Sequence, residues 1–215
     1  AELKLIGFDV GASDTAGLAV VARDASDRPL AGAYNVCYVN GFQTQPGEGE
    51  DWLTHHGTAV LRDAAGDPVV DPDWADEYVL DPSTDAQRAT IVEVLGPVLE
   101  ECAQKGYDAV EIDNLDTFAR FPGIDRAGAL DLAGRYVALA HDHGLAVAQK
   151  NAAEFTEQAR GLGFDFAVAE ECGAFNECAS YSRAYGTHVL QSEYTDNLPV
   201  PFDSVCADAD RAPLT

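Results

Sequence analysis

The chain has 215 residues, of which 47% are hydrophobic, so it is long and apolar enough for one barrel-sized domain over residues 1–215. Its 37 acidic and 13 basic side chains give a formal net charge of −24, which argues against binding to nucleic acid or to an anionic membrane, since both attract basic patches. A charge of this sign is compatible with a solvated, highly soluble surface and with the attraction of a cationic ligand.

The first part of the chain contains three apolar stretches that predict β-strands. Each ends in, or is followed by, a polar side chain: residues 3–10 with Asp9, residues 18–22 before Asp24, and residues 34–40 ending at Asn40. The loop 41–47 is too rich in turn-forming residues to be helical, and we expect it to lie over the rim formed by the strand ends.

The next part of the chain is less regular. Residues 48–76 contain several Pro and Gly residues and predict an irregular, partly helical crossover. Residues 78–81 predict a short strand that ends at Asp81. Residues 84–105 place apolar side chains at intervals of three and four and stop at Gly106, which is the pattern of an amphipathic helix with a glycine stop.

Strands and helices alternate through the second half of the chain. We predict strands over residues 106–113, 145–151, 164–171 and 188–193, and helices over residues 125–143, 154–162, 178–185 and near Val205. This alternation argues for a parallel sheet, and eight strands in total predict a (β/α)8 TIM barrel. No glycine-rich phosphate loop supports a nucleotide-binding fold instead.

Two of the predicted strands end in carboxylates. One ends at Asp113 and carries Glu111 on the same face, because successive side chains point to opposite faces. The other ends in Glu170 and Glu171, of which alternation places only one inside a barrel. Barrel enzymes keep their chemistry at the carboxyl ends of the strands, and two carboxylates together are typical of a glycoside hydrolase. A helix cap or turn is the structural alternative for Asp113.

Further side chains near the strand ends are candidate sugar contacts, because hydroxyl groups are bound by convergent polar groups beside aromatic faces. They are Asp9, Asp24, Tyr38, Asn40, Asp81, Asn114, Asp116, Glu193 and Tyr194, each of which can also be a structural rim residue. Lys150 ends the strand between the two acidic strands, where it can keep one carboxylate ionised or form a structural ion pair. Phe42, Trp52 and Trp74 fit core or loop anchors better than stacking platforms.

The sequence predicts no metal and no cofactor. Asp113-Asn114-Leu115-Asp116 resembles part of a calcium loop, but the glycine and the distal glutamate of that motif are missing. None of the five histidines has ligand spacing at a strand end, which counts against a zinc hydrolase. Among the cysteines, Cys172 and Cys178 can form a disulfide, which would favour an oxidising compartment, and Cys37 and Cys102 can be buried thiols or a second bridge.

Four motifs make the chain resemble glycoside hydrolase family 114, the endo-α-1,4-polygalactosaminidase-like barrels. They are Cys37-Tyr38-Val39-Asn40, Val110-Glu111-Ile112-Asp113-Asn114-Leu115-Asp116, Gln149-Lys150-Asn151 and Ala167-Val168-Ala169-Glu170-Glu171-Cys172, in this order over most of the chain. Members of the family usually have Pro where Ile112 stands and a more aromatic first strand. They also tend to continue into a further apolar strand beyond residues 213–215, so we expect a barrel that is incomplete at its C-terminal end.

The resemblance implies a secreted enzyme, with its targeting segment absent from this chain, that cleaves α-1,4 linkages in a galactosamine-containing polysaccharide. It implies Asp113 as nucleophile and Glu170, rather than Glu171, as general acid/base, although exchanged roles fit the motifs equally. Galactosamine polymers without acetyl groups are cationic, so the negative charge of the protein would concentrate them. A barrel that binds an amino-sugar polymer without cutting it and a metal-dependent hydrolase on the same fold are the alternatives. The oligomeric state stays open.

Overall fold

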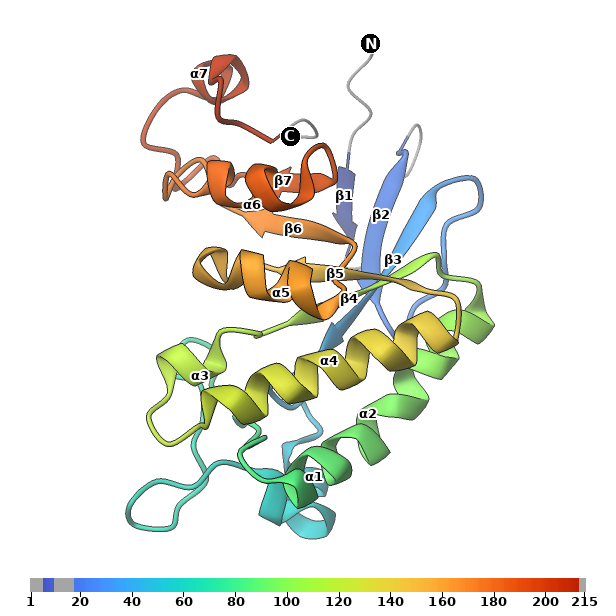
Figure 1. The fold of residues 1–215 in the computed structure, drawn as a ribbon, viewed down its shortest axis with the longest axis vertical. Helices are drawn as coiled ribbons and strands as arrows, with labels where there is room; N and C mark the ends of the chain where they lie inside the picture. Colours follow the sequence, from blue (N-terminus) through green and yellow to red (C-terminus); the bar gives the residue numbers. More distant parts are fainter. Residues whose placement is uncertain (1–5, 10–17, 213–215) are drawn as a thin grey trace.

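The computed structural model describes residues 6–9 and 18–212, which form a curled sheet of seven parallel strands with helices on its outer side (Figure 1). The strands neighbour one another in chain order: β1 Ile6–Asp9, β2 Val20–Asp24, β3 Tyr34–Asn40, β4 Ala109–Asp113, β5 Ala146–Lys150, β6 Phe166–Glu170 and β7 Val189–Ser192. Within the described residues no ladder joins β1 to β7. The fold is therefore the predicted TIM barrel in an incomplete form.

The predicted strand at residues 78–81 is wrong. Residues 78–80 form only isolated antiparallel bridges, and their partners lie in the same connection between β3 and α2 (Asp85–Lys105). A short apolar run has the same local pattern whether it pairs within a loop or joins the barrel, so the sequence could not separate the two cases. Asp81 consequently does not stand at the end of a barrel strand.

The remaining predicted elements are confirmed over the described residues, with small shifts at their ends; residues 3–5 and 10 of the first predicted strand lie outside the described residues. Besides α2, the helices are α1 Gly49–His55, α3 Thr117–Arg120, α4 Arg126–Asp142, α5 Thr156–Leu162, α6 Cys178–Tyr185 and α7 Phe202–Ala207, with 3₁₀ turns at Gly57–Ala59 and Ala153–Phe155. In α2, Thr84 and Gln87 form a capping box and Gly106 ends the helix at a φ of 91°, which a residue without Cβ adopts most easily. Helices α2 and α4 pack side by side against the sheet (Figure 1).

Alternation along the strands separates two buried layers. Side chains on the outer face, such as Val110 and Ile112, join the main core beneath the helices. Side chains on the inner face form two small apolar clusters: Ala22, Val36 and Ala109, and Ala148, Val168 and Leu190. Toward the carboxyl ends of the strands the inner residues become charged, beginning with Glu111 and Lys150, which are both buried. The apolar clusters thus form a floor below a polar site.

Two disulfides connect parts of this fold. Cys37 of β3 is bonded to Cys102 of α2, so the bridge is the alternative that holds for this pair. Cys172 and Cys178 are bonded across the loop before α6, as their short spacing predicted. Cys206 of α7 is a free thiol. The first bridge fixes a strand that carries site residues to the helix behind it.

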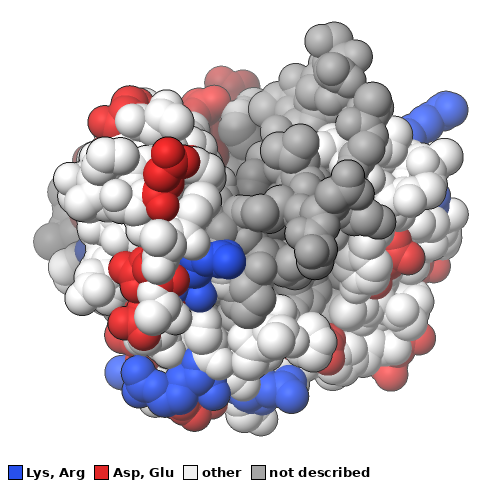
Figure 2. Space-filling view, turned by 90° about the horizontal axis from the view of Figure 1, so that it is seen from above, with Lys and Arg blue, Asp and Glu red and all other residues white. Residues whose placement is uncertain are grey.

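The surface reflects the acidic composition of the chain. Acidic side chains are spread over the described part of the face seen from above, and basic side chains gather mainly along one edge (Figure 2). None of the helices in the described ranges is both long and apolar enough to cross a membrane.

Candidate active site

The carboxyl ends of the strands open into a cavity of about 1370 Å³. Its lining includes Asp24, Tyr38, Asn40, Asp113, Lys150 and Glu170 from the strands, Trp74 and Glu77 from residues 41–84, Tyr194 from the segment after β7, and Leu95, Val98, Glu101 and Lys105 from α2. The fold therefore brings together residues that are far apart in the sequence, such as Asp24 and Tyr194.

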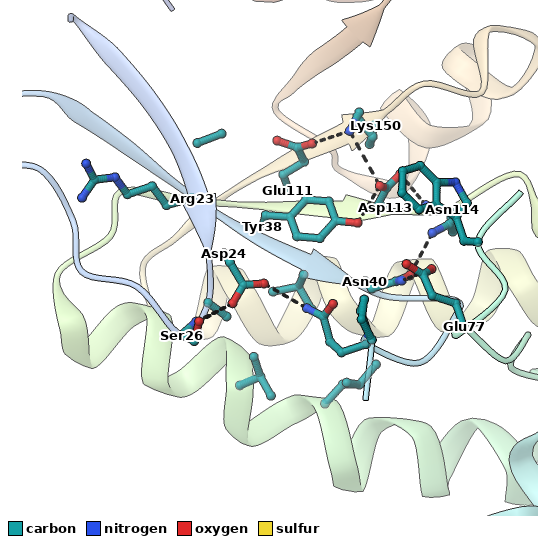
Figure 3. Close-up of a pocket in the computed structure, with 18 of the residues that line it drawn as sticks. Arg23, Asp24, Ser26, Tyr38, Asn40, Glu77, Glu111, Asp113, Asn114 and Lys150 are labelled. Atoms are coloured by element: carbon teal, nitrogen blue, oxygen red, sulfur yellow. Dashed lines mark hydrogen bonds and ion pairs between the residues drawn. The ribbon is translucent and has the colours of Figure 1, made fainter. Parts of the chain in front are cut away.

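Lys150 lies at the centre of three carboxylates. Its Nζ is 2.9 Å from Glu111 Oε1, 3.7 Å from Asp113 Oδ2 and 3.4 Å from Glu170 Oε2, and Figure 3 shows it beside Glu111 and Asp113. Burial would lower the pKa of Lys150, but the three carboxylates outweigh it and raise the pKa above its ordinary value. Burial raises the pKa of Glu111, and Lys150 opposes this change. Lys150 is thus a charged group shared by both proposed catalytic acids.

Asp113 is held from two neighbouring elements. Tyr38 of β3 donates its hydroxyl hydrogen bond to Asp113 Oδ2 at 2.8 Å, as Figure 3 shows, and the backbone amide of Asn114 donates to Oδ1 at 2.7 Å. Burial and the nearby Asp113 carboxylate raise the pKa of Tyr38, so this phenol stays protonated and remains a donor. The Asp113 side chain is 21% exposed. Its carboxylate is therefore fixed in orientation yet still reaches the cavity.

Glu170 has a more open environment. Its Oε1 accepts a hydrogen bond of 2.9 Å from the hydroxyl of Tyr194, an exposed residue after β7. Burial and Glu170 raise the pKa of Tyr194 to about 12. Glu171 has left the strand, with a φ of 57°, and accepts a hydrogen bond from Asn197. Glu170 lies on the same face of β6 as Val168. Glu170, and not Glu171, therefore faces the interior of the barrel.

A hydrogen-bonded chain joins the connection 41–84 to the loop after β4. Asn40 Nδ2 donates to Glu77 Oε2 at 2.8 Å, and Asn114 Nδ2 donates to Asn40 Oδ1 at 2.9 Å (Figure 3). Arg120 of α3 donates to Asn114 Oδ1 at 2.6 Å and to the buried carboxylate of Asp71 at 2.7 Å. Burial raises the pKa of Glu77, and the hydrogen bond from Asn40 opposes this change. Hydrogen bonds therefore connect the segments that form the rim around Asp113.

Most residues predicted from the sequence line the cavity: Asp24, Tyr38, Asn40, Asp113, Asn114, Asp116, Lys150, Glu170 and Tyr194. Two are placed elsewhere. Asp81 accepts a hydrogen bond from Gln87 of α2 at 2.7 Å, and Glu193 accepts from the backbone amide of Gly173 at 2.6 Å, so both carboxylates fasten loops. The side chain of Asp9 lies outside the described residues.

Sequence reasoning missed four residues of this region. Glu77, Asp71 and Arg120 were not predicted as site residues. Trp74 was predicted to be a core or loop anchor rather than a stacking platform, but its side chain is 61% exposed and lines the cavity. One available signal was the run Asp71-Pro72-Asp73-Trp74-Ala75-Asp76-Glu77, in which four acids surround a tryptophan. Another was the spacing of Asp116 and Arg120, which are four residues apart and form an ion pair of 3.0 Å.

Within the part of the chain that the structure describes, one group of side chains is close enough to hold a metal ion. It consists of Cys172, Cys178 and Glu193. The two sulfur atoms of this group are joined in a disulfide, so they are not available as thiolate ligands.

The family model of glycoside hydrolase family GH114 matches residues 6–214 of this chain. The search of curated protein sequences found no significant match to this chain.

Several solved structures share the fold. Ega3 from Aspergillus fumigatus, in complex with galactosamine, is 20% identical with a TM-score of 0.73, over 99% of this chain and 85% of that chain. The glycoside hydrolase domain of PelA from Pseudomonas aeruginosa is 15% identical with a TM-score of 0.60, over 88% and 80%. An α-galactosidase from Thermus thermophilus is 17% identical with a TM-score of 0.56, over 86% and 47%. At these identities the likeness establishes the fold.

Proposed function

Because the chain belongs to glycoside hydrolase family GH114, and is thus a glycoside hydrolase acting on a carbohydrate, we propose that it cleaves α-1,4 linkages in a galactosamine-containing polysaccharide. In this proposal Asp113 is the nucleophile and Glu170 the general acid/base. The observation that carries it is the position of both carboxylates around the buried ammonium group of Lys150, at the cavity end of the barrel.

The two carboxylates lie close enough for the retaining mechanism that we include in the proposal. Asp113 Oδ2 and Glu170 Oε2 lie 3.7 and 3.4 Å from the same nitrogen, so these oxygens are at most about 7 Å apart. Retaining enzymes place their carboxyl groups roughly 5–5.5 Å apart and inverting enzymes roughly 6.5–9.5 Å apart. The limit on these two oxygens is compatible with the retaining separation.

The reaction has two steps. In the first, a carboxylate oxygen of Asp113 bonds to the anomeric carbon while the bond to the leaving sugar breaks, and Glu170 transfers its proton to the leaving oxygen. In the second, Glu170 removes a proton from a water molecule, whose oxygen bonds to the same carbon and releases Asp113. Glu170 then holds the proton again, so the enzyme is ready for a further cycle.

The surrounding side chains support these roles. Lys150 places positive charge beside Asp113, which must be an anion to attack the anomeric carbon, and Glu111 beneath it holds the ammonium group in position at 2.9 Å. The hydroxyl of Tyr38 and the amide of Asn114 orient the Asp113 carboxylate toward one point in the cavity. These contacts are the kind of fixed hydrogen bonds and charges that stabilise developing charge in a transition state.

The substrate assignment has its own support. Acidic side chains outnumber basic ones in the cavity lining, including Asp24, Glu48, Glu77 and Asp116, which suits the ammonium group of an amino sugar. The similar Aspergillus fumigatus protein was solved with galactosamine bound. The two disulfides fit folding in an oxidising compartment, so we include secretion in the proposal.

The proposal is tested by measuring reducing-end release from α-linked galactosamine, N-acetylgalactosamine and galactose polymers. We expect release from the galactosamine polymer by the wild-type protein and its loss in both Asp113→Asn and Glu170→Gln, with unchanged circular dichroism. Saturable binding without release would favour a non-catalytic sugar-binding barrel. Loss of activity on adding a chelator would favour a metal-dependent hydrolase.

A further inference from the structure

Trp74 is exposed although its side chain is large and apolar. It is 61% exposed, whereas Trp52, the only other tryptophan in the sequence, is 1% exposed. Trp74 also lines the same cavity as Asp113 and Glu170. An aromatic face that stays in contact with water at the wall of a binding cavity is available for a ligand.

The turn that carries Trp74 is held firmly. The amide of Asp71 donates to the carbonyl of Glu77 at 3.0 Å, and the amide of Glu77 donates to the carbonyl of Trp74 at 2.9 Å, so the segment closes on itself. The buried Asp71 carboxylate accepts hydrogen bonds of 2.7 Å from both Gln43 and Arg120. The exposure of Trp74 is therefore fixed by a buried anchor at the base of its turn.

The segment that carries this aromatic side chain is acidic. Asp73 and Asp76 lie on either side of it in the sequence and are exposed, and Glu77 lines the cavity nearby. A tryptophan face attracts a cation through its π-electrons, and neighbouring carboxylates strengthen the attraction. The ring face would pack against the apolar side of a sugar while the acids face its ammonium group.

We propose that Trp74 is the platform of a second sugar subsite, which binds a positively charged galactosamine unit of the polysaccharide away from the bond that is cut. This inference rests on the proposed function and assigns one part of its substrate binding. The platform contacts only chains long enough to reach it from the catalytic pair. It therefore increases affinity for long substrates and leaves the chemical step unchanged.

The fluorescence of the protein gives a direct test. Galactosamine oligosaccharides of increasing length are titrated into Asp113→Asn, which binds substrate without turning it over. We expect a blue shift of the emission and protection from acrylamide quenching with the longer oligosaccharides, because Trp74 leaves water when a sugar covers it. The double variant Asp113→Asn/Trp74→Phe contains only the buried Trp52 and should show no such response.

Kinetics supply a second readout. We expect Trp74→Ala to raise KM for long galactosamine chains about tenfold, which corresponds to about 1.4 kcal/mol of lost binding. Its kcat should be unchanged, as should KM for the shortest substrate that is cut. Trp74→Phe should restore most of the affinity because it keeps an aromatic face. Phe175→Ala is the matched control, since Phe175 is 62% exposed and is not among the residues that line the cavity.

Two results would overturn the inference. One is an unchanged emission spectrum on binding of long oligosaccharides, with equal KM values for Trp74→Ala and wild type at every length. The other is an equal effect of Trp74→Ala on neutral galactose oligosaccharides, which would exclude the cationic ligand. Binding with the expected Trp74 response but without release of reducing ends would instead contradict the proposed hydrolysis and leave the subsite standing.

Discussion

The ends of β4 and β6 each present one carboxylate to the cavity, but the two are held differently. Asp113 of β4 accepts from a half-buried tyrosine and from a backbone amide, at 2.8 and 2.7 Å. Glu170 of β6 accepts a hydrogen bond of 2.9 Å from Tyr194, which is 45% exposed. Lys150 lies between them and is the charge that both share.

This difference matches what the two proposed roles demand. A nucleophile must approach one carbon along one direction, which favours a carboxylate fixed by several short hydrogen bonds. A general acid/base must exchange its proton with a leaving group and with water, which favours a carboxyl group with an open side. The contrast therefore supports the proposed roles of Asp113 and Glu170, which the sequence motifs left exchangeable.

The largest expected effect is that of Asp113→Asn. An amide cannot form the covalent bond to the sugar, so we expect kcat on the galactosamine polymer to fall about 10⁴-fold or more. Intact-mass spectrometry during turnover of a slow substrate should detect a glycosyl adduct on the wild-type protein and none on the variant. Activity within tenfold of wild type, with the variant folded, would rule out Asp113 as the nucleophile.

Glu170→Gln should cost less and be partly recoverable. We expect kcat on the polymer to fall about 10²- to 10⁴-fold, the usual range for loss of general acid/base catalysis. The loss should be smaller on an aryl glycoside whose leaving group needs no proton, and added azide should restore part of the turnover. Rescue of Asp113→Asn instead of Glu170→Gln would reverse the two roles.

Substitution of Lys150 tests how much its ion pair with Glu111 contributes to the stability of the protein. Lys150→Met leaves Glu111 buried without its ammonium partner, and we expect the free energy of unfolding to fall by about 3–5 kcal/mol. The double variant Glu111→Gln/Lys150→Met removes both charges and should regain part of this loss. Chemical denaturation of the single and double variants measures both values. Equal stability of the single variant and wild type would contradict the ion pair.

The two tyrosines allow a matched comparison at smaller magnitude. Tyr38→Phe removes a half-buried donor to Asp113, and we expect kcat to fall about tenfold. Tyr194→Phe removes an exposed donor to Glu170, where water can take its place, and we expect a fall of about two- to threefold. Steady-state kinetics of the two variants side by side gives the answer. A larger effect at Tyr194 would contradict the difference between the two ends.

The smallest expected effect concerns pH and Glu77. Because burial raises its folded-state pKa, the folded protein keeps a proton that the unfolded chain has lost just above its pKa of about 4.3. The contribution of Glu77 to the free energy of unfolding of wild type should therefore fall as pH rises through this window, and Glu77→Gln should lack this contribution. We expect the variant to gain stability relative to wild type between acid and neutral pH, measured by denaturation at several pH values. Parallel curves would show that burial of Glu77 leaves its titration unchanged.

Local patterns were sufficient for most of the secondary structure. The helix after Thr84 and its glycine stop at Gly106 depend on contacts within a few residues, so their sequence signals are strong. The strand ends at Asp113 and Glu170 were visible for the same reason. The prediction of a barrel strand over residues 78–81 was wrong, because bridges within a loop and strands in a barrel have the same short apolar pattern.

Consecutive residues were enough to predict the alternation of strands and helices, the acidic strand ends and the resemblance to the family. Each of these features depends on residues that are close together in the sequence, so periodicity and residue type are enough to predict it. Tertiary structure alone decided that Glu170 rather than Glu171 faces the interior, that Lys150 contacts three carboxylates, and that Trp74 stays exposed beside the cavity. These features depend on the curvature of the sheet and on contacts between loops that are far apart in the sequence. Packing between elements sets the distances between such side chains, and no local sequence pattern encodes it.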